Sequence, residues 1–128
     1  MRVREAMSTE ILSVGPQHTL REVSRLMTSR KFGAAVVLDP ESSGIGILTE
    51  RDILNAISGG LDPDTELAED HRTADAVTAG PDWDLDQAAA SMIRGGFRHL
   101  IVIDNGEVMG MLSVRDIVRA RIVNAARP

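Results

Sequence analysis

Residues 46–53 read Gly-Ile-Leu-Thr-Glu-Arg-Asp-Ile, and 64 positions later residues 110–117 read Gly-Met-Leu-Ser-Val-Arg-Asp-Ile. Five of the eight paired residues are identical. Upstream, the sequence repeats at an offset of 65, so that Gly15-Pro16 returns as Gly80-Pro81. Repetition at a fixed period indicates a duplicated unit, and a unit that cannot bury its own apolar face often packs on its twin. The sequence therefore predicts two copies of one small fold.

The first copy predicts the element order strand, helix, strand, strand, helix. Residues 11–14 form a short apolar strand, and Thr19-Leu20-Arg21-Glu22 has the spacing of a capping box, which marks a helix start. The apolar stretches 34–38 and 45–48 follow, and the polar residues 39–44 between them predict a hairpin turn. The motif of residues 46–53 then begins the last helix. The predicted fold class is α/β of the α+β type.

The second copy repeats this order with clearer punctuation. Asp84 caps a helix that stops at Gly95-Gly96, and Asn105-Gly106 is a strong hairpin signal. Trp83, directly before the cap, has the position of a hydrophobic staple. The opening strand, residues 76–79, lacks the larger apolar side chains of its counterpart. We predict a first domain at residues 1–58, a breaker-rich linker at 59–66 and a second domain at 67–125.

Composition limits the classes of partner. Of the 128 residues, 43% are hydrophobic and 26% are charged, which is typical of a globular protein. The net charge of −5 disfavours nucleic acid, and the absence of cysteine excludes disulfides and thiolate metal sites. The three histidines have no metal-ligand spacing. Because no apolar run is long enough to span a bilayer and no signal peptide opens the chain, we expect a cytoplasmic protein without a membrane partner.

The repeated motif, Gly-h-x-[Thr/Ser]-x-x-Asp with h apolar, has two interpretations. Its members are Gly46, Thr49 and Asp52 in the first copy and Gly110, Ser113 and Asp116 in the second. The hydroxyl and the carboxylate can form a capping box and nothing more. They can also bind a ribose and an anion, because they stand beside the free N–H groups of a helix start. In that case the glycine leaves a bare strand face for a flat base.

Ordered and duplicated, these features resemble the cystathionine-β-synthase (CBS) domain in tandem, the arrangement called a Bateman module. The resemblance rests on Met7-Ser8, on residues 97–104 and on the two motifs, and it covers nearly the whole chain. It implies two β-α-β-β-α repeats with pseudo-twofold symmetry. It also implies two clefts that in many relatives hold ATP, ADP, AMP or S-adenosylmethionine, and a homodimer. No catalytic cofactor is implied.

In this family each cleft mixes the opening strand of one copy with the Thr/Ser-x-x-Asp of the other. For the first cleft the resemblance implies a site made of Thr9, Ile11, Arg98, His99, Ser113, Arg115 and Asp116. For the second cleft it implies Asp75, Ala76, Thr49, Arg51 and Asp52. Gly33 and Ala34 stand where the first cleft has Arg98 and His99, so the second cleft lacks that cationic contact. We expect the first cleft to be the occupied one, and the second to be empty or to take a less charged adenosine compound. Both motif arginines can instead be solvated side chains at a helix start.

Three classes of function compete. An enzyme is the weakest, because no nucleophile beside an orienting base and no phosphate-binding loop stands out. A regulatory module would bind an adenosine compound and signal to a separate effector protein. A ligand-free module would use the fold only for dimerisation or protein interaction, with the motifs serving as caps. Capping gives no reason for two adjacent potential cations, Arg98 and His99, and this favours the ligand-sensing module.

Overall fold

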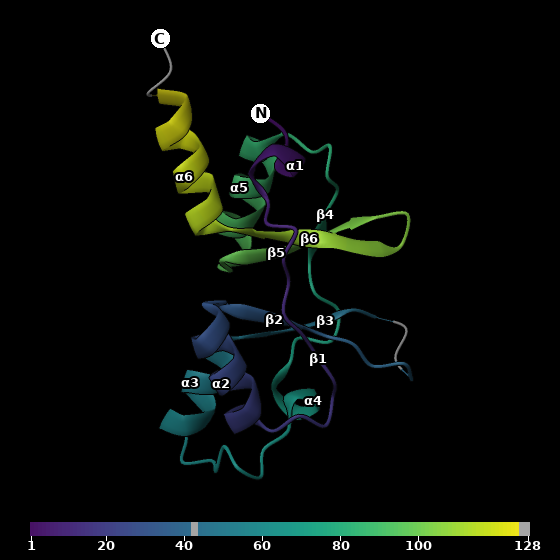
Figure 1. Ribbon diagram of the computed structural model, residues 1–128, viewed down its shortest axis with the longest axis vertical. Coiled ribbons are helices and arrows are strands. Elements are labelled where there is room, and N and C mark those ends of the chain that lie inside the picture. Colours follow the sequence, from purple (N-terminus) through teal and green to yellow (C-terminus); the bar gives the residue numbers. More distant parts are fainter. Residues whose placement is uncertain (42–43, 126–128) are drawn as a thin grey trace. The chain divides into compact units, whose positions relative to one another are not determined.

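The computed structural model describes residues 1–41 and 44–125 (Figure 1). It forms two compact units: unit 1 comprises Met1–Glu10 and Val77–Pro128, and unit 2 comprises Ile11–Ala76. Each unit holds one three-stranded sheet with its own helices. The predicted fold class, two mixed repeats of helices and strands, is confirmed. The predicted sequence boundaries 1–58, 59–66 and 67–125 stay a prediction, since the compact units divide the chain at other places.

Unit 2 is a continuous stretch of chain. Its elements are β1 (Ser13–Val14), α2 (Leu20–Arg30), β2 (Ala34–Val37), β3 (Gly46–Thr49), α3 (Glu50–Ser58) and α4 (Ala68–His71). The sheet order is β1-β2-β3, with β1 parallel and β3 antiparallel to β2. Helices α2 and α3 lie side by side on one face of this sheet (Figure 1).

The sequence of α2 explains its start and its buried face. The Thr19 hydroxyl accepts a hydrogen bond from the Glu22 N–H, and the Thr19 N–H donates to the Glu22 carboxylate, so the predicted capping box is confirmed. The helix ends at Lys31, which adopts the left-handed conformation. The core of the unit is an apolar cluster of buried side chains: Leu12, Val14, Leu20, Val23, Met27, Ala35, Val37, Leu48, Ile53, Ala56 and Ala68.

Unit 1 repeats this architecture with two separate pieces of chain. Its elements are α1 (Val3–Ala6), β4 (Thr78–Ala79), α5 (Leu85–Gly95), β5 (His99–Asp104), β6 (Glu107–Ser113) and α6 (Val114–Ala125). The sheet order is β4-β5-β6, again with one parallel and one antiparallel pair. Asp84 caps α5, and Asn105 and Gly106 both have positive φ at the β5–β6 turn, as predicted. Trp83 packs on the core of this unit, as predicted for a staple.

The opening strands are shorter than predicted. Residues 13–14 and 78–79 form ladder pairs, whereas the sequence predicts strands over 11–14 and 76–79. Each is an edge strand, which pairs on one side only, with β2 or β5. Of the predicted turn at 39–44, Ser42 and Ser43 lie outside the described residues.

Two short helices were not predicted, and they explain how the units divide the chain. We call residues 3–8 and 68–73 the lead segments; they contain α1 and α4. In unit 1 the lead segment crosses β6, where Ser8 and Met111 exchange two backbone hydrogen bonds of 2.9 Å. In unit 2 Thr73 and Ile47 exchange the equivalent bonds, of 3.0 and 2.9 Å. The lead segment of unit 1, residues 3–8, therefore lies in the first predicted domain, which otherwise forms unit 2. The lead segment of unit 2, residues 68–73, lies in the second predicted domain, which otherwise forms unit 1.

Candidate functional site

The motif of unit 1 forms the junction between β6 and α6. The Ser113 N–H donates to Asp116 Oδ2 at 2.9 Å, and the Asp116 N–H donates to Ser113 Oγ at 3.1 Å. This is the reciprocal geometry of a capping box. The second carboxylate oxygen, Oδ1, accepts a hydrogen bond of 3.2 Å from Arg119. A ribose that used this carboxylate would therefore compete with Arg119, whose side chain is 65% exposed.

The motif of unit 2 has the same capping geometry. The Thr49 N–H donates to Asp52 Oδ2 at 2.8 Å, and the Asp52 N–H donates to the Thr49 hydroxyl at 3.3 Å. Three residues after Asp52 stands Asn55, where unit 1 has Arg119. Both motifs therefore cap a helix, and the carboxylate of unit 1 has in addition a cationic neighbour.

Arg98, which directly precedes β5, and His99, the first residue of β5, lie next to the start of α6. The Val114 N–H donates to the Arg98 carbonyl at 3.0 Å, and His99 is paired with Ser113 in the β5–β6 ladder. Arg98 and Arg115 are exposed, and neither forms an ion pair within the described part of the chain. The structure thus brings Arg98, His99 and Ser113 together, with Arg115 and Asp116 in the first turn of the helix.

The counterparts in unit 2 follow the predicted alignment. The Glu50 N–H donates to the Gly33 carbonyl at 3.0 Å, and Ala34 is paired with Thr49. Gly33 and Ala34 therefore occupy the places of Arg98 and His99 in the fold as well as in the sequence. Arg51 is exposed in the first turn of α3 and has no ion pair among the described residues. Near the start of α3 there is one arginine, Arg51. Near the start of α6 there are two arginines, Arg98 and Arg115, and a histidine, His99.

The remaining predicted residues follow the lead segments. Thr9 comes directly after Ser8, so it lies beside β6, the strand that ends in Ser113. Ile11 belongs to unit 2. In unit 2 the Ala76 N–H donates to the Ile45 carbonyl, so Asp75 and Ala76 lie beside the beginning of β3. Thr49 ends that strand, four residues or about 13 Å further along at the rise of a β-strand.

The motif glycines have a different role from the predicted one. A Cβ on Gly110 would collide with the Ser8 carbonyl, and a Cβ on Gly46 would lie 2.8 Å from Arg72 Cδ and 3.3 Å from the Thr73 carbonyl. We predicted that these glycines leave a strand face bare for a flat base. That prediction was wrong, because the face on which a glycine Cβ would stand is already covered. The lead segment fills that side, and glycine is required because the two backbones approach closely.

The described residues contain neither a group of metal ligands nor a membrane-spanning helix. In residues 1–41 and 44–125, no three His, Asp or Glu side chains are grouped so that they could hold a metal ion. Over the same residues, no helix has the length and apolar character that crossing a membrane requires.

The duplicated unit, with a capped Thr/Ser-x-x-Asp helix start after each hairpin and a lead segment across each third strand, defines a tandem-repeat α/β protein. The chain belongs to the CBS domain family, whose model matches it twice, at residues 3–59 and 68–123. The predicted tandem CBS arrangement is confirmed.

Known proteins share this arrangement. A 17.7 kDa protein from Acidianus ambivalens is 35% identical over 120 residues, which cover 93% of this chain and 72% of that protein. The CBS domain protein PAE2072 from Pyrobaculum aerophilum, solved in complex with AMP, is 30% identical and covers 98% of both chains with a TM-score of 0.84. The CBS domain pair of protein MJ0100, in complex with 5′-methylthioadenosine and S-adenosyl-L-methionine, has a TM-score of 0.85 over 97% of this chain. Its 20% identity shows likeness of fold alone.

Proposed function

We propose that this protein is a regulatory module that binds an adenosine-containing nucleotide and signals to a separate effector protein in the cytoplasm. The compounds proposed are ATP, ADP, AMP and S-adenosylmethionine. The proposed site is built on unit 1, around the start of α6, with Arg98, His99, Ser113, Arg115 and Asp116. Thr9 is proposed to contact the base. The protein is proposed to have no catalytic activity of its own.

The observation that carries this proposal is the charge at the start of α6. Arg98 and Arg115 are exposed and form no ion pair in the described residues, and both flank a helix N-terminus, which itself favours anions. Unit 2 has the same backbone hydrogen bond from helix to strand, but with Gly33 as its acceptor. Because capping needs no cation at position 98, the arginine is better explained by a phosphate-bearing ligand. The AMP complex of PAE2072, at 30% identity, supports the same class of ligand.

A ligand-free interaction module is the second candidate. The capping bonds of both motifs are complete, so the hydroxyl and carboxylate residues have a structural role without a ligand. Helix α6 also exposes an apolar stripe: Val114 is 40% exposed, Val118 51% and Ile122 65%. We propose that this stripe is covered by a second copy of the chain, in a homodimer that either candidate function would use.

A thermal-unfolding screen distinguishes the two candidates. The purified chain is heated with ATP, ADP, AMP or S-adenosylmethionine, beside the variant Arg98→Gly, which gives unit 1 the residue that unit 2 has at this place. A ligand at 100 times its Kd adds about 2.7 kcal/mol and raises the midpoint by roughly 8 to 14 °C for a chain of this size. We expect one of the four compounds to do so, and Arg98→Gly to remove most of the shift.

Two controls separate binding from stability. Arg94→Ala removes an exposed arginine of α5 outside the proposed site and should keep the full shift. His99→Ala should reduce it. A sensor is ruled out if no compound moves the midpoint of the wild type while all variants melt together. That result would favour the interaction module.

A further inference from the structure

Arg119 is bound to the carboxylate that the proposed nucleotide site offers to a ribose. Its Nη1 donates a hydrogen bond of 3.2 Å to Asp116 Oδ1, while Asp116 Oδ2 accepts the Ser113 N–H of the capping box. Both oxygens of this carboxylate therefore have a partner within unit 1. The bond at Oδ2 belongs to the cap, so Oδ1 is the oxygen that a ligand can take over.

Arg119 approaches this carboxylate from the solvent. The side chain of Asp116 is 11% exposed and that of Arg119 is 65% exposed. A ligand also arrives from the solvent, and Arg119 covers the small part of the carboxylate that the ligand can reach. An ion pair with so exposed a partner is weak, so a bound ribose can displace it at small cost.

The guanidinium of Arg119 lies near the other arginines of the proposed site. Residues four apart share a helix face, and helical side chains lean toward the N-terminus. Arg119 therefore stands above Arg115, and its bond to Asp116 shows that it reaches back over the first turn of α6. Arg98 is held at the same helix start, because its carbonyl accepts the Val114 N–H.

Unit 2 has no such contact at its own motif. At the repeat offset of 64, Asn55 stands in the place of Arg119, and Asp52 forms no ion pair within residues 1–41 and 44–125. The capping bonds of Thr49 and Asp52 are nevertheless complete. The cap therefore does not require a cation three residues after the aspartate, and capping does not explain Arg119.

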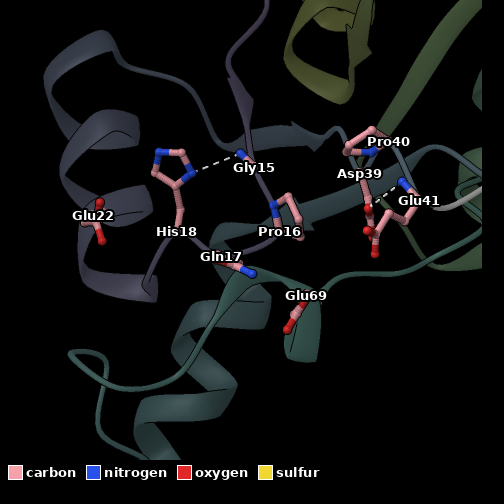
Figure 2. Close-up of a pocket in the computed structure, with 9 residues that line it drawn as sticks. All are labelled: Gly15, Pro16, Gln17, His18, Glu22, Asp39, Pro40, Glu41 and Glu69. Carbon is pink, nitrogen blue, oxygen red and sulfur yellow. Dashed lines mark hydrogen bonds between the residues drawn. The ribbon is translucent and has the colours of Figure 1, made fainter.

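The pocket of unit 2 offers no alternative place for a phosphate. Figure 2 shows this pocket, which is lined by the carboxylates of Glu22, Asp39, Glu41 and Glu69. Among the described residues that line it, none is an arginine or a lysine. A concave surface lined with negative charge repels an anion. The start of α6 thus remains the place where this chain can bind one.

We propose that Arg119 is a specificity-determining residue, which selects adenosine compounds that carry a phosphate. This inference rests on the proposed nucleotide site. In the free protein Arg119 is paired with Asp116. A ribose that binds Asp116 releases the guanidinium, and the 5′-phosphate of the same ligand accepts its hydrogen bonds in place of Oδ1. A ligand without phosphate breaks the same ion pair and gives Arg119 no new partner.

This selection divides the four proposed compounds. AMP, ADP and ATP carry a phosphate on the 5′ carbon, where Arg119 can join Arg98 and Arg115. S-adenosylmethionine carries a sulfonium cation at that position, and three guanidinium groups repel it. We therefore expect the three phosphorylated compounds to bind more tightly than S-adenosylmethionine. Adenosine is the probe that lacks only the phosphate.

Titration calorimetry of the purified chain with AMP, ATP, S-adenosylmethionine and adenosine tests this proposal. The variant Arg119→Asn gives unit 1 the residue that unit 2 has at this place. The matched control is Arg121→Asn: Arg121 is an exposed arginine of the same helix that pairs with Asp86, so this change removes an equal charge without touching Asp116.

In the wild type, AMP or ATP should bind at least about tenfold more tightly than adenosine, as expected for charge-assisted hydrogen bonds to a phosphate. In Arg119→Asn, the phosphorylated compound should lose about tenfold, while adenosine gains about twofold because the ion pair no longer competes. Arg121→Asn should keep the wild-type ratio of the two Kd values.

A purely structural Arg119 would change the midpoint of thermal unfolding and leave that ratio as it is. An unchanged ratio in Arg119→Asn, with AMP or ATP still bound, overturns the role of Arg119 and leaves the nucleotide site intact. Tighter binding of adenosine or S-adenosylmethionine than of AMP and ATP by the wild type also overturns it. If the wild type binds none of these compounds, the proposed function itself fails, and Arg119 forms only a surface ion pair.

Discussion

Gly110 and Gly46 are the single residues on which the attachment of each lead segment depends. At Gly110 the atom in the way of a Cβ is a backbone carbonyl, that of Ser8. At Gly46 the nearest atom is the Cδ of Arg72, which belongs to a flexible side chain. A side chain can move aside at small cost, whereas a paired backbone cannot move without losing hydrogen bonds. The two glycines are therefore equivalent in sequence and unequal in tolerance.

The variant Gly110→Ala should destabilise unit 1 by about 1–3 kcal/mol, as overpacking usually does. The added methyl group forces the two Ser8–Met111 hydrogen bonds apart. Urea unfolding measures the loss, and amide exchange at Ser8 and Met111 locates it. Gly46→Ala is the matched control and should lose less. Equal losses in the two variants would show that the Ser8 carbonyl does not determine the difference.

The N-terminal cap of helix α2 makes the stability of that helix depend on pH. Both hydrogen bonds from Thr19, from its N–H and from its hydroxyl, lower the pKa of Glu22 below its ordinary value of 4.5. A group whose pKa is lower in the folded state stabilises the fold above its unfolded pKa. This contribution is lost as the pH falls through the folded value.

We therefore expect Glu22→Gln to be less stable than the wild type at neutral pH and to approach it in acid. Urea unfolding of both proteins, at neutral pH and at a pH below the Glu22 pKa, measures the convergence. NMR titration of the Glu22 carboxyl gives the pKa directly. A difference in stability that stays constant over this range would contradict the capping role of the ionised carboxylate.

Helix α6 has no buried residue within the described chain, although Ile117 and Ala120 pack against the core of unit 1. Another side of the helix carries the exposed Val114, Val118 and Ile122. If a second copy covers this stripe, a charge placed in it should separate the copies without unfolding either one, because the buried core is untouched.

The variants Val118→Glu and Ile122→Glu should each halve the mass measured by light scattering while the far-UV spectrum is unchanged. Ile93→Glu is the matched control: Ile93 is 83% exposed on α5, outside the stripe, and its replacement should leave the mass as it is. A wild type that is already monomeric, or a dimer that both α6 variants retain, would remove α6 from the interface.

The two units differ in charge as well as in continuity. Residues 11–76 carry eleven Asp and Glu against six Lys and Arg, so unit 2 holds the whole net charge of −5, and the residues of unit 1 sum to zero. The nucleotide site is proposed on the neutral unit. An anionic phosphate therefore meets no net negative charge on the unit that is proposed to bind it.

Unit 2 is one continuous stretch of chain and unit 1 is not, and this predicts how each unit responds to truncation. Deletion of residues 1–10 removes from unit 1 the hydrogen bonds made by Val3, Arg4 and Ser8, and it leaves the residues of unit 2 intact. We expect hydrogen exchange to accelerate in β5 and β6 and to stay unchanged in β2 and β3. Uniform acceleration in both sheets would show that the units do not unfold separately.

Much of the fold could be predicted from the sequence because its signals are local. The Thr19–Glu22 box, the Asp84 cap and the Asn105-Gly106 turn each act within four residues of chain, and all three are confirmed. The lead segments could not be predicted in the same way. Their four-residue helices are held by hydrogen bonds to chain 50 to 80 residues away, and periodicity carries no signal for such contacts.

In the candidate site, too, local features could be predicted from the sequence and long-range contacts could not. The positions of Ser113, Asp116 and His99 follow from a motif and a hairpin register, and the structure groups them. The role of Gly110 depends on Ser8, over a hundred residues away, and was missed. The repeat itself also shows one place where the two copies differ. At the offset of 65, His18 replaces Trp83, Glu69 replaces Arg4 and Gln17 replaces Asp82.

Unit 1 is built from two pieces of chain, and a circular permutation of the gene would join them. Both termini belong to unit 1, and the chain passes between the units only after Glu10 and after Ala76. A circular permutant that opens at Val77, joins residue 128 to residue 1 and closes at Ala76 would make each unit one uninterrupted piece. The permutant would keep a single crossing between them. In it, two copies that are now interlaced would become separable modules, and either one could be recombined with another protein on its own.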